Sequence, residues 1–213
     1  MSRARQLAAD LLTIEAVKLA PDDPFTWASG LRSPIYCDNR LTLAYPRMRR
    51  LITDGFKAML ERHGWDPDVV VGTATAGIPH AAWLAGDLNL PMAYVRSKAK
   101  AHGRGNRIEG VVQPGQHVLV VEDLISTGAS SLSVVEALRE AGAEVLGLVA
   151  IFSYGLSTAS EAFASLGVPF ETISSFPVLL ELARDEESIT ADQAASLEAW
   201  HADPKAWSNA NAK

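Results

Sequence analysis

The order of apolar and polar positions sets the middle of the chain apart from its two ends. Across about residues 68–174, short apolar runs alternate with longer amphipathic stretches of helical spacing. The runs at 69–72 and 117–121 are typical of strands buried on both faces of a sheet. The pattern predicts strands at 69–72, 92–95, 117–121, 145–152 and 170–173, and helices at 78–88 and 130–142. Such alternation predicts an α/β fold with a mainly parallel central sheet flanked by helices.

The segment before this region has a different pattern. Leu7, Leu11 and Ile14 recur at helical spacing and predict one amphipathic helix over the first twenty residues, ended before Pro21. Residues 22–45 are rich in turn formers. A second helix is expected over 45–63, with Pro46 in its first turn and Gly64 at its end.

These patterns predict one domain over residues 1–213, with its core at about 65–175. The terminal segments, about 1–45 and 176–205, are expected to pack together as a small hood subdomain. The last dozen residues are small and polar, and we expect them to be frayed.

Composition narrows the class of protein. The formal net charge of −6 argues against non-specific nucleic-acid binding, and hydrophobic residues make up 48% of the chain, enough for a substantial core. The single cysteine, Cys37, excludes an intrachain disulfide and favours a reducing compartment. The sequence has no apolar run of about 18 residues. A cytoplasmic enzyme without a membrane segment is therefore expected.

The strongest chemical signal lies at residues 118–130. A buried strand is followed by Glu122 and Asp123, and the small and hydroxyl residues of 126–130 then lead into a helix. Such a turn offers several N–H groups at the positive end of a helix dipole, which predicts a phosphate-binding site. The two carboxylates would repel phosphate, so ribose hydroxyls or a ligand-held metal are their expected partners. By itself the turn could be only a helix cap.

A second signal is basic. Residues 96–107 carry five cations and a histidine between two expected strands, in an otherwise acidic protein. Cations placed beside a phosphate site can neutralise a departing pyrophosphate, and closure of such a loop would exclude water. The alternative is a solvated surface loop.

Three segments resemble known proteins. Residues 118–130 resemble the thirteen-residue phosphoribosyl-pyrophosphate signature of type I phosphoribosyltransferases. Residues 96–103, R-S-K-A-K-A-H-G, resemble the catalytic loop of orotate phosphoribosyltransferases, and 25–36, F-T-W-A-S-G-L-R-S-P-I-Y, resemble the hood segment of the same family. The turn at 72–79 matches the segment that offers backbone amides to pyrophosphate in these enzymes.

The resemblance implies a type I phosphoribosyltransferase fold and the transfer of phosphoribosyl from phosphoribosyl pyrophosphate to orotate, giving orotidine 5′-monophosphate. It assigns catalysis to Lys100, His102 and Arg96, and orotate binding to Ser126, Phe25 and Tyr36. It implies that phosphoribosyl pyrophosphate contacts Thr73, Ala74, Arg96, Lys98, Lys100, His102, Glu122, Asp123, Leu124, Ile125, Ser126, Thr127, Gly128, Ala129 and Ser130. It also implies Mg²⁺ held mainly by the co-substrate, and a homodimer whose loop 97–109 acts across subunits.

Some positions depart from the family pattern. Ser97, Ala28 and Ala76 stand where relatives often have lysine, and Ser153-Tyr154 follow Phe152 where many present an arginine to the orotate carboxylate. Two other functions stay open: a phosphoribosyltransferase for a purine base, and a regulator that senses phosphoribosyl pyrophosphate. A regulator of nucleic acid would need a basic reading module, for which the cluster at 47–50 is the only candidate.

Overall fold

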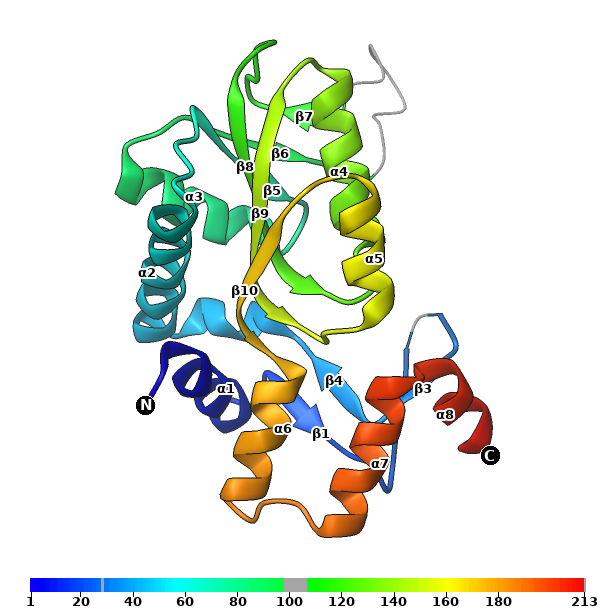
Figure 1. Cartoon of the computed structure of the whole chain (residues 1–213). Coiled ribbons are helices and arrows are strands. Elements are labelled where there is room, and N and C mark those ends of the chain that lie inside the picture. The colour runs from blue at the N-terminus through cyan, green and yellow to red at the C-terminus, as the bar shows by residue number, and fades with distance from the viewer. Residues whose placement is uncertain (28, 98–106, 213) are drawn as a thin grey trace.

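The computed structural model describes residues 1–27, 29–97 and 107–212, and its centre is a six-stranded sheet within those ranges (Figure 1). The strand order is β10-β9-β8-β5-β6-β7, and all neighbouring pairs are parallel except β6–β7. The strands of this sheet are β5 (Val69–Thr73), β6 (Met92–Val95), β7 (Ile108–Glu109), β8 (His117–Ile125), β9 (Glu144–Ser153) and β10 (Phe170–Ser175). The predicted mainly parallel sheet is confirmed.

Helices cover both faces of the sheet, as Figure 1 shows. On one side lie α2 (Pro46–His63) and α3 (Gly77–Leu88), and on the other α4 (Ala129–Glu140) and α5 (Ser157–Ser165). The prediction for α2 is confirmed at both ends, because Pro46 opens the helix and Gly64 closes it in the left-handed conformation with φ 63°. In the described ranges, no helix combines the length and hydropathy needed to cross a membrane.

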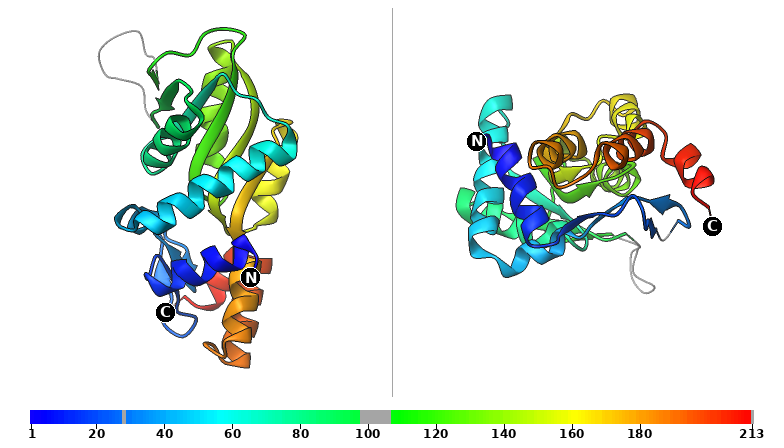
Figure 2. Two further views of the ribbon diagram at one scale, coloured as in Figure 1. Left: turned by 90° about the vertical axis from the view of Figure 1, so that its left-hand side faces the viewer. Right: turned by 90° about the horizontal axis from the view of Figure 1, so that it is seen from below.

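The N-terminal and C-terminal segments both lie at the end of the sheet where β9 and β10 end, with the two termini themselves on opposite sides of this region (Figures 1 and 2). The N-terminal elements are α1 (Arg3–Thr13), β1 (Val17–Leu19), β2 (Phe25–Thr26), β3 (Arg32–Ser33), β4 (Ile35–Cys37) and the 3-10 helix η1 (Asn39–Ala44). The C-terminal elements are α6 (Phe176–Asp185), α7 (Ala191–Ala202) and α8 (Pro204–Ala210). We call these two groups together the hood.

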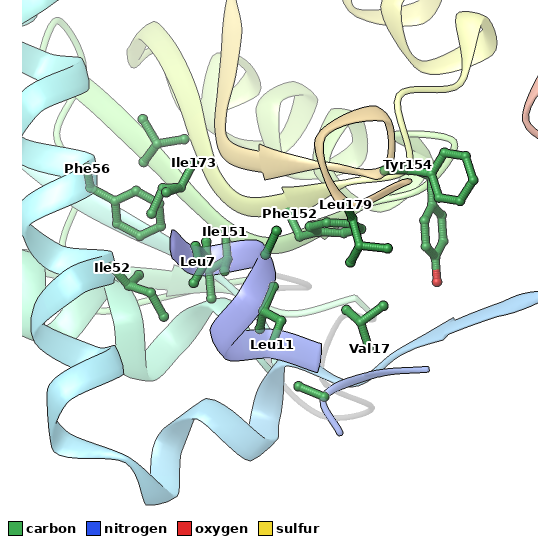
Figure 3. Packing of buried hydrophobic residues seen from close by; sticks show 14 of the residues in the cluster. Leu7, Leu11, Val17, Ile52, Phe56, Ile151, Phe152, Tyr154, Ile173 and Leu179 are labelled. Atoms are coloured by element: carbon green, nitrogen blue, oxygen red, sulfur yellow. The ribbon is translucent and has the colours of Figure 1, made fainter. Parts of the chain in front are cut away.

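The hood shares a hydrophobic core with the α2–α3 side of the sheet. Figure 3 shows Leu7 and Leu11 of α1 packed near Phe56 of α2, Ile151 of β9 and Leu179 of α6. All five side chains are fully buried. A second core fills the α4–α5 side of the sheet.

Three expectations about element boundaries are wrong. The first helix ends at Thr13, not near residue 20; Glu15 adopts a positive φ of 57° and Val17–Leu19 instead pair with β4. Strand β8 runs on to Ile125, beyond the predicted end at 121. The last dozen residues are not frayed as a whole, because most of them form α8, in which Trp207 is 6% exposed.

Candidate functional site

An adjacent pair of acids lies near the carboxyl end of β8. Glu122 is buried, and its carboxylate accepts hydrogen bonds from the Asp123 N–H (3.1 Å) and the Ser131 hydroxyl (3.1 Å). Burial, and then the Asp123 charge, hold the pKa of Glu122 well above its usual value, and burial also raises the pKa of Asp123. Among the described residues neither acid forms a salt bridge, although the Arg40 charge interacts with Asp123. The pair is therefore available to hydroxyls or to a metal carried by a ligand.

Asn39 fixes this pair from the hood side. Its side-chain amide donates a 2.7 Å hydrogen bond to the Asp123 carbonyl, and it is 1% exposed. The contact joins positions 84 residues apart in the chain. Neither Asn39 nor Ser131 was predicted from the sequence. No local pattern marks Asn39, whereas Ser131 directly follows the signature and could have been considered.

The turn after β8 leads into α4 as predicted. Gly128 is the residue before the helix and has a φ of 82°, a conformation that side chains with a Cβ rarely adopt. An added Cβ would also lie 2.9 Å from Phe163. No side chain caps the first turn of α4, while Thr127, Ala129 and Ser130 are exposed. The N–H groups at this helix end can therefore bind an anion.

Main-chain placement limits what two members of the signature can contribute. The Ile125 side chain is fully buried in the α4–α5 core, and its carbonyl accepts hydrogen bonds from Tyr154 N–H and the Ser153 hydroxyl. Leu124 packs on the opposite core. Neither side chain carries a polar group, so these residues position the turn and any contact with a polar ligand would come from the main chain.

The Thr73–Ala74 turn lies beside the phosphate turn. A cavity of about 200 Å³ joins the two; its lining residues are Thr73, Ala74, Val95, Ser97, Arg107, Ser130, Ser133 and Val134. The Thr73 hydroxyl is buried without a hydrogen-bond partner among the described residues. The Ala74–Thr75 peptide bond is cis. Gly77 lets the start of α3 press against the Val121 carbonyl of β8.

Of the basic loop, the described residues include the start, Arg96 and Ser97, and the last residue, Arg107. Arg96 follows β6, and its Nη1 lies 3.6 Å from Oε1 of Glu109 in β7. Ser97 lines the cavity. Lys98, Lys100 and His102 lie outside the described residues.

Aromatic side chains gather where the hood faces the strand ends. Phe25 and Tyr36, the two residues expected at the base, have ring centroids 5.6 Å apart, and Tyr36 is 41% exposed. Trp27 stacks on Tyr154 at 5.3 Å, and the Tyr154 ring meets Trp200 edge-on at 5.5 Å. Tyr154 and Trp200 were not predicted. Tyr154 stands in the segment after Phe152 where relatives present an arginine, and it supplies an aromatic ring there.

The sheet, the acid pair and the phosphate turn together define a phosphoribosyltransferase. Residues 43–166, more than half of the chain, match the family model described as "Phosphoribosyl transferase domain". The orotate phosphoribosyltransferase of Staphylococcus haemolyticus is 55% identical to the chain over 92% of its length and 98% of the relative. The chain belongs to the orotate phosphoribosyltransferase family.

Solved structures agree with this assignment. The orotate phosphoribosyltransferase of Aeropyrum pernix has a TM-score of 0.73 and 32% identity, over 82% of this chain and 96% of that one. The Mycobacterium tuberculosis orotate phosphoribosyltransferase in complex with 5-phospho-α-D-ribosyl 1-diphosphate has a TM-score of 0.64 and 26% identity, over 83% and 98%. The predicted family and fold are confirmed.

Proposed function

We propose that the chain transfers the phosphoribosyl group of phosphoribosyl pyrophosphate to orotate, giving orotidine 5′-monophosphate and pyrophosphate in de novo pyrimidine (UMP) synthesis. One observation carries this proposal. A pair of adjacent acids, buried Glu122 and partly buried Asp123, forms no salt bridge within the described residues and lies beside an uncapped helix start, in a chain 55% identical to an orotate phosphoribosyltransferase.

Different groups of the described residues bind different parts of the co-substrate. The carboxylates of Glu122 and Asp123 accept hydrogen bonds from the ribose 2′- and 3′-hydroxyls. The N–H groups of residues 126–130 bind the 5′-phosphate at the positive end of α4. The turn that begins at Thr73 and Ala74 binds the pyrophosphate, but the expected contact from the Ala74 amide is not available, because its N–H already donates to the Val95 carbonyl at 3.0 Å. The cavity that joins Thr73 to Ser130 supports this division.

Charge stabilisation comes from the basic loop. As the bond from the ribose to pyrophosphate breaks, negative charge grows on the leaving group. Arg96, Lys100 and His102 stabilise that charge, with Lys98 as an added cation, and the loop excludes water from the reacting carbon.

Orotate binds between the hood and the end of β8. The Phe25 and Tyr36 rings lie against the base, and Ser126 hydrogen-bonds to the ring. The exposed edge of Tyr36 and its contact with Phe25 support this placement.

The acid pair fits a magnesium ion that arrives with the co-substrate. Oxygen donors are the ligands that Mg²⁺ prefers, and here two carboxyl groups adjoin the proposed ribose position. No cluster of three or more potential ligands occurs in the ranges the structure describes, so most ligands would come from the co-substrate. When bound, the ion neutralises charge on the pyrophosphate.

The protein acts as a cytoplasmic homodimer in this proposal, with loop 97–109 of one subunit completing the site of the other. Nucleic acid is not a partner. The basic cluster at 47–50 forms the first turn of α2, where Met48 is buried and the Arg49 guanidinium lies 5.0 Å from the centre of the Trp83 ring. These contacts support a structural role for the cluster.

The decisive assay is loss of orotate absorbance that depends on phosphoribosyl pyrophosphate, with adenine as the alternative base. We expect turnover with orotate only. Lys100→Ala is expected to lower turnover by roughly 10²–10³-fold, the usual effect of removing one charge-stabilising donor. Lys205→Ala, at an exposed position of α8, is the matched control. Turnover with adenine alone would contradict the proposed function, and near-wild-type turnover of Lys100→Ala would contradict the role of the loop.

A further inference from the structure

One guanidinium joins the start of the basic loop to the helix that carries the phosphate turn. Arg107 immediately precedes β7, and its Nε donates a 2.8 Å hydrogen bond to the Arg96 carbonyl. Its Nη1 donates to both the carbonyl (3.2 Å) and the hydroxyl (2.9 Å) of Ser133, in the second turn of α4. In return, the Arg107 carbonyl accepts from the Arg96 N–H at 2.9 Å.

These contacts lie beside the proposed co-substrate site. Arg107 and Ser133 line the same cavity as Thr73 and Ser130. Nη2 of Arg107 has no hydrogen-bond partner within the described ranges. The side chain is partly buried, and its planar fork of donors fixes the relative positions of the two groups it bridges.

The arrangement holds Arg96 at two points. Arg107 fixes the main chain of Arg96 through a reciprocal pair of hydrogen bonds, and Glu109 restrains its guanidinium at 3.6 Å. Because catalysis by charge stabilisation depends on placement, a displacement of about 1 Å can cost roughly 10²-fold in rate. A residue that sets the position of Arg96 therefore has a kinetic role without touching the substrate.

We propose that Arg107 is a positioning residue for Arg96, which it anchors to helix α4 through Ser133. The inference rests on the proposed function, in which Arg96 binds the pyrophosphate. Arg107 lies outside the segment 96–103 that resembles the catalytic loop of the family.

The first test compares two arginines that each bind a main-chain carbonyl next to α4. Arg107→Ala is expected to lower kcat/KM for phosphoribosyl pyrophosphate by about 10- to 100-fold, with KM for orotate within about twofold of wild type. The matched control is Arg139→Ala, which removes an arginine on α4 that donates to the Leu166 carbonyl at 2.9 Å, far along the helix from Ser130. It should lower thermal stability without changing either KM. Arg107→Lys should recover only part of the loss, since a single ammonium cannot reproduce the fork.

A double-mutant cycle identifies the residue through which Arg107 acts. If Arg107 works by placing Arg96, Arg107→Ala should change kcat/KM by less than about twofold in an Arg96→Ala background, so the two effects are not additive. Ser133→Ala, which removes one acceptor and leaves the carbonyl, should show a loss of a few-fold in the same parameter and serves if Arg107→Ala does not fold.

Additive effects in the cycle would overturn the proposal, as would wild-type kinetics in folded Arg107→Ala or Ser133→Ala. Either result leaves the proposed function intact, because wild-type turnover of orotate is measured in the same assay. Absence of turnover in the wild type would overturn the proposed function itself, and with it the basis of the inference.

Discussion

At the scale of single residues, burial shifts the pKa values of two titratable side chains in opposite directions. Burial disfavours the charged form of either group. It therefore raises the pKa of Glu122 and lowers that of His80, which is 1% exposed, to about 4. The two groups should give the protein opposite responses to pH.

Glu122→Gln should stabilise the protein at alkaline pH while weakening its function. The folded-state pKa of Glu122 is raised, so its contribution to stability is present below the unfolded value and is lost as pH rises through the folded pKa. The glutamine side chain does not titrate; its oxygen can accept from the Asp123 N–H while its NH2 group donates to the Ser131 hydroxyl. Melting curves should show a Tm gain over wild type at pH 8 that narrows toward pH 4.5, and KM for phosphoribosyl pyrophosphate should rise. A gain equal at both pH values, or one shared by the exposed control Glu186→Gln, would contradict the assignment.

His80 should make the wild type sensitive to acid. Its folded-state pKa of about 4 lies below the ordinary histidine value of 6.5, so its contribution to stability is present above pH 6.5 and is lost as pH falls through about 4. A shift of this size corresponds to about 3 kcal/mol. His80→Leu should flatten the fall in unfolding free energy between pH 6.5 and 4, measured by urea denaturation. An unchanged slope in His80→Leu would count against this account.

At the scale of elements, the local hydrophobic pattern predicted the strands of the central sheet correctly. It gave the wrong structure for segments whose conformation depends on pairing with residues far away in the sequence. The runs at 69–72 and 117–121 are apolar throughout, and buried parallel strands need that composition. Val17 and Leu19 fit both a helix and a strand, and only pairing with Ile35–Cys37 decides between them. Helix α8 was not predicted because its small polar residues are typical of a frayed chain end. The features that indicate a helix are the Asp203 cap and the buried Trp207.

The candidate site also has a part that the sequence predicts and a part that only the folded structure reveals. The contiguous signature from Glu122 to Ser130 could be recognised in the sequence, since a strand end, a turn and a helix start are neighbours along the chain. Asn39 and Tyr154 could not, because their contacts with Asp123 and Trp27 join segments far apart in the sequence. The residues around the proposed base site could therefore be identified only from the folded structure.

The contact of α3 with β8 gives a prediction at this scale. A Cβ at Gly77 would collide with the Val121 carbonyl, whereas one at Gly86, also in α3, would meet nothing within 4 Å. Gly77→Ala should destabilise the protein by about 1–3 kcal/mol, the usual range for overpacking, and raise KM for phosphoribosyl pyrophosphate by shifting the Thr73–Ala74 turn. Gly86→Ala should stabilise the helix by about 0.5–1 kcal/mol with unchanged kinetics. Urea denaturation and steady-state assays check both, and equal effects of the two substitutions would contradict the packing argument.

At the scale of the whole molecule, the N-terminal and C-terminal segments contact each other at the end of the sheet. The Arg32 N–H donates a 2.8 Å hydrogen bond to the Ser208 hydroxyl, and the Trp207 indole N–H donates to the Ser196 hydroxyl at 3.1 Å. These bonds join β3 to α8 and α8 to α7, while the Asn39 amide joins the hood to the Asp123 carbonyl. The remaining element of the proposed site, the basic loop, then decides whether one chain or two complete it.

Mixing two inactive variants tests the division of the site between subunits. Lys100→Ala lacks a loop cation and Asp123→Asn lacks a ribose ligand, so each homodimer should be nearly inactive. In a hybrid dimer with loops acting across subunits, one site combines an intact acid pair with an intact loop, and the other has neither. Random exchange at equal amounts makes about half of the dimers hybrids, so about a quarter of wild-type activity should return. Recovery is measured after co-refolding or co-expression. If each loop instead serves its own subunit, no site in the mixture is intact, and activity should stay at the level of the separate variants.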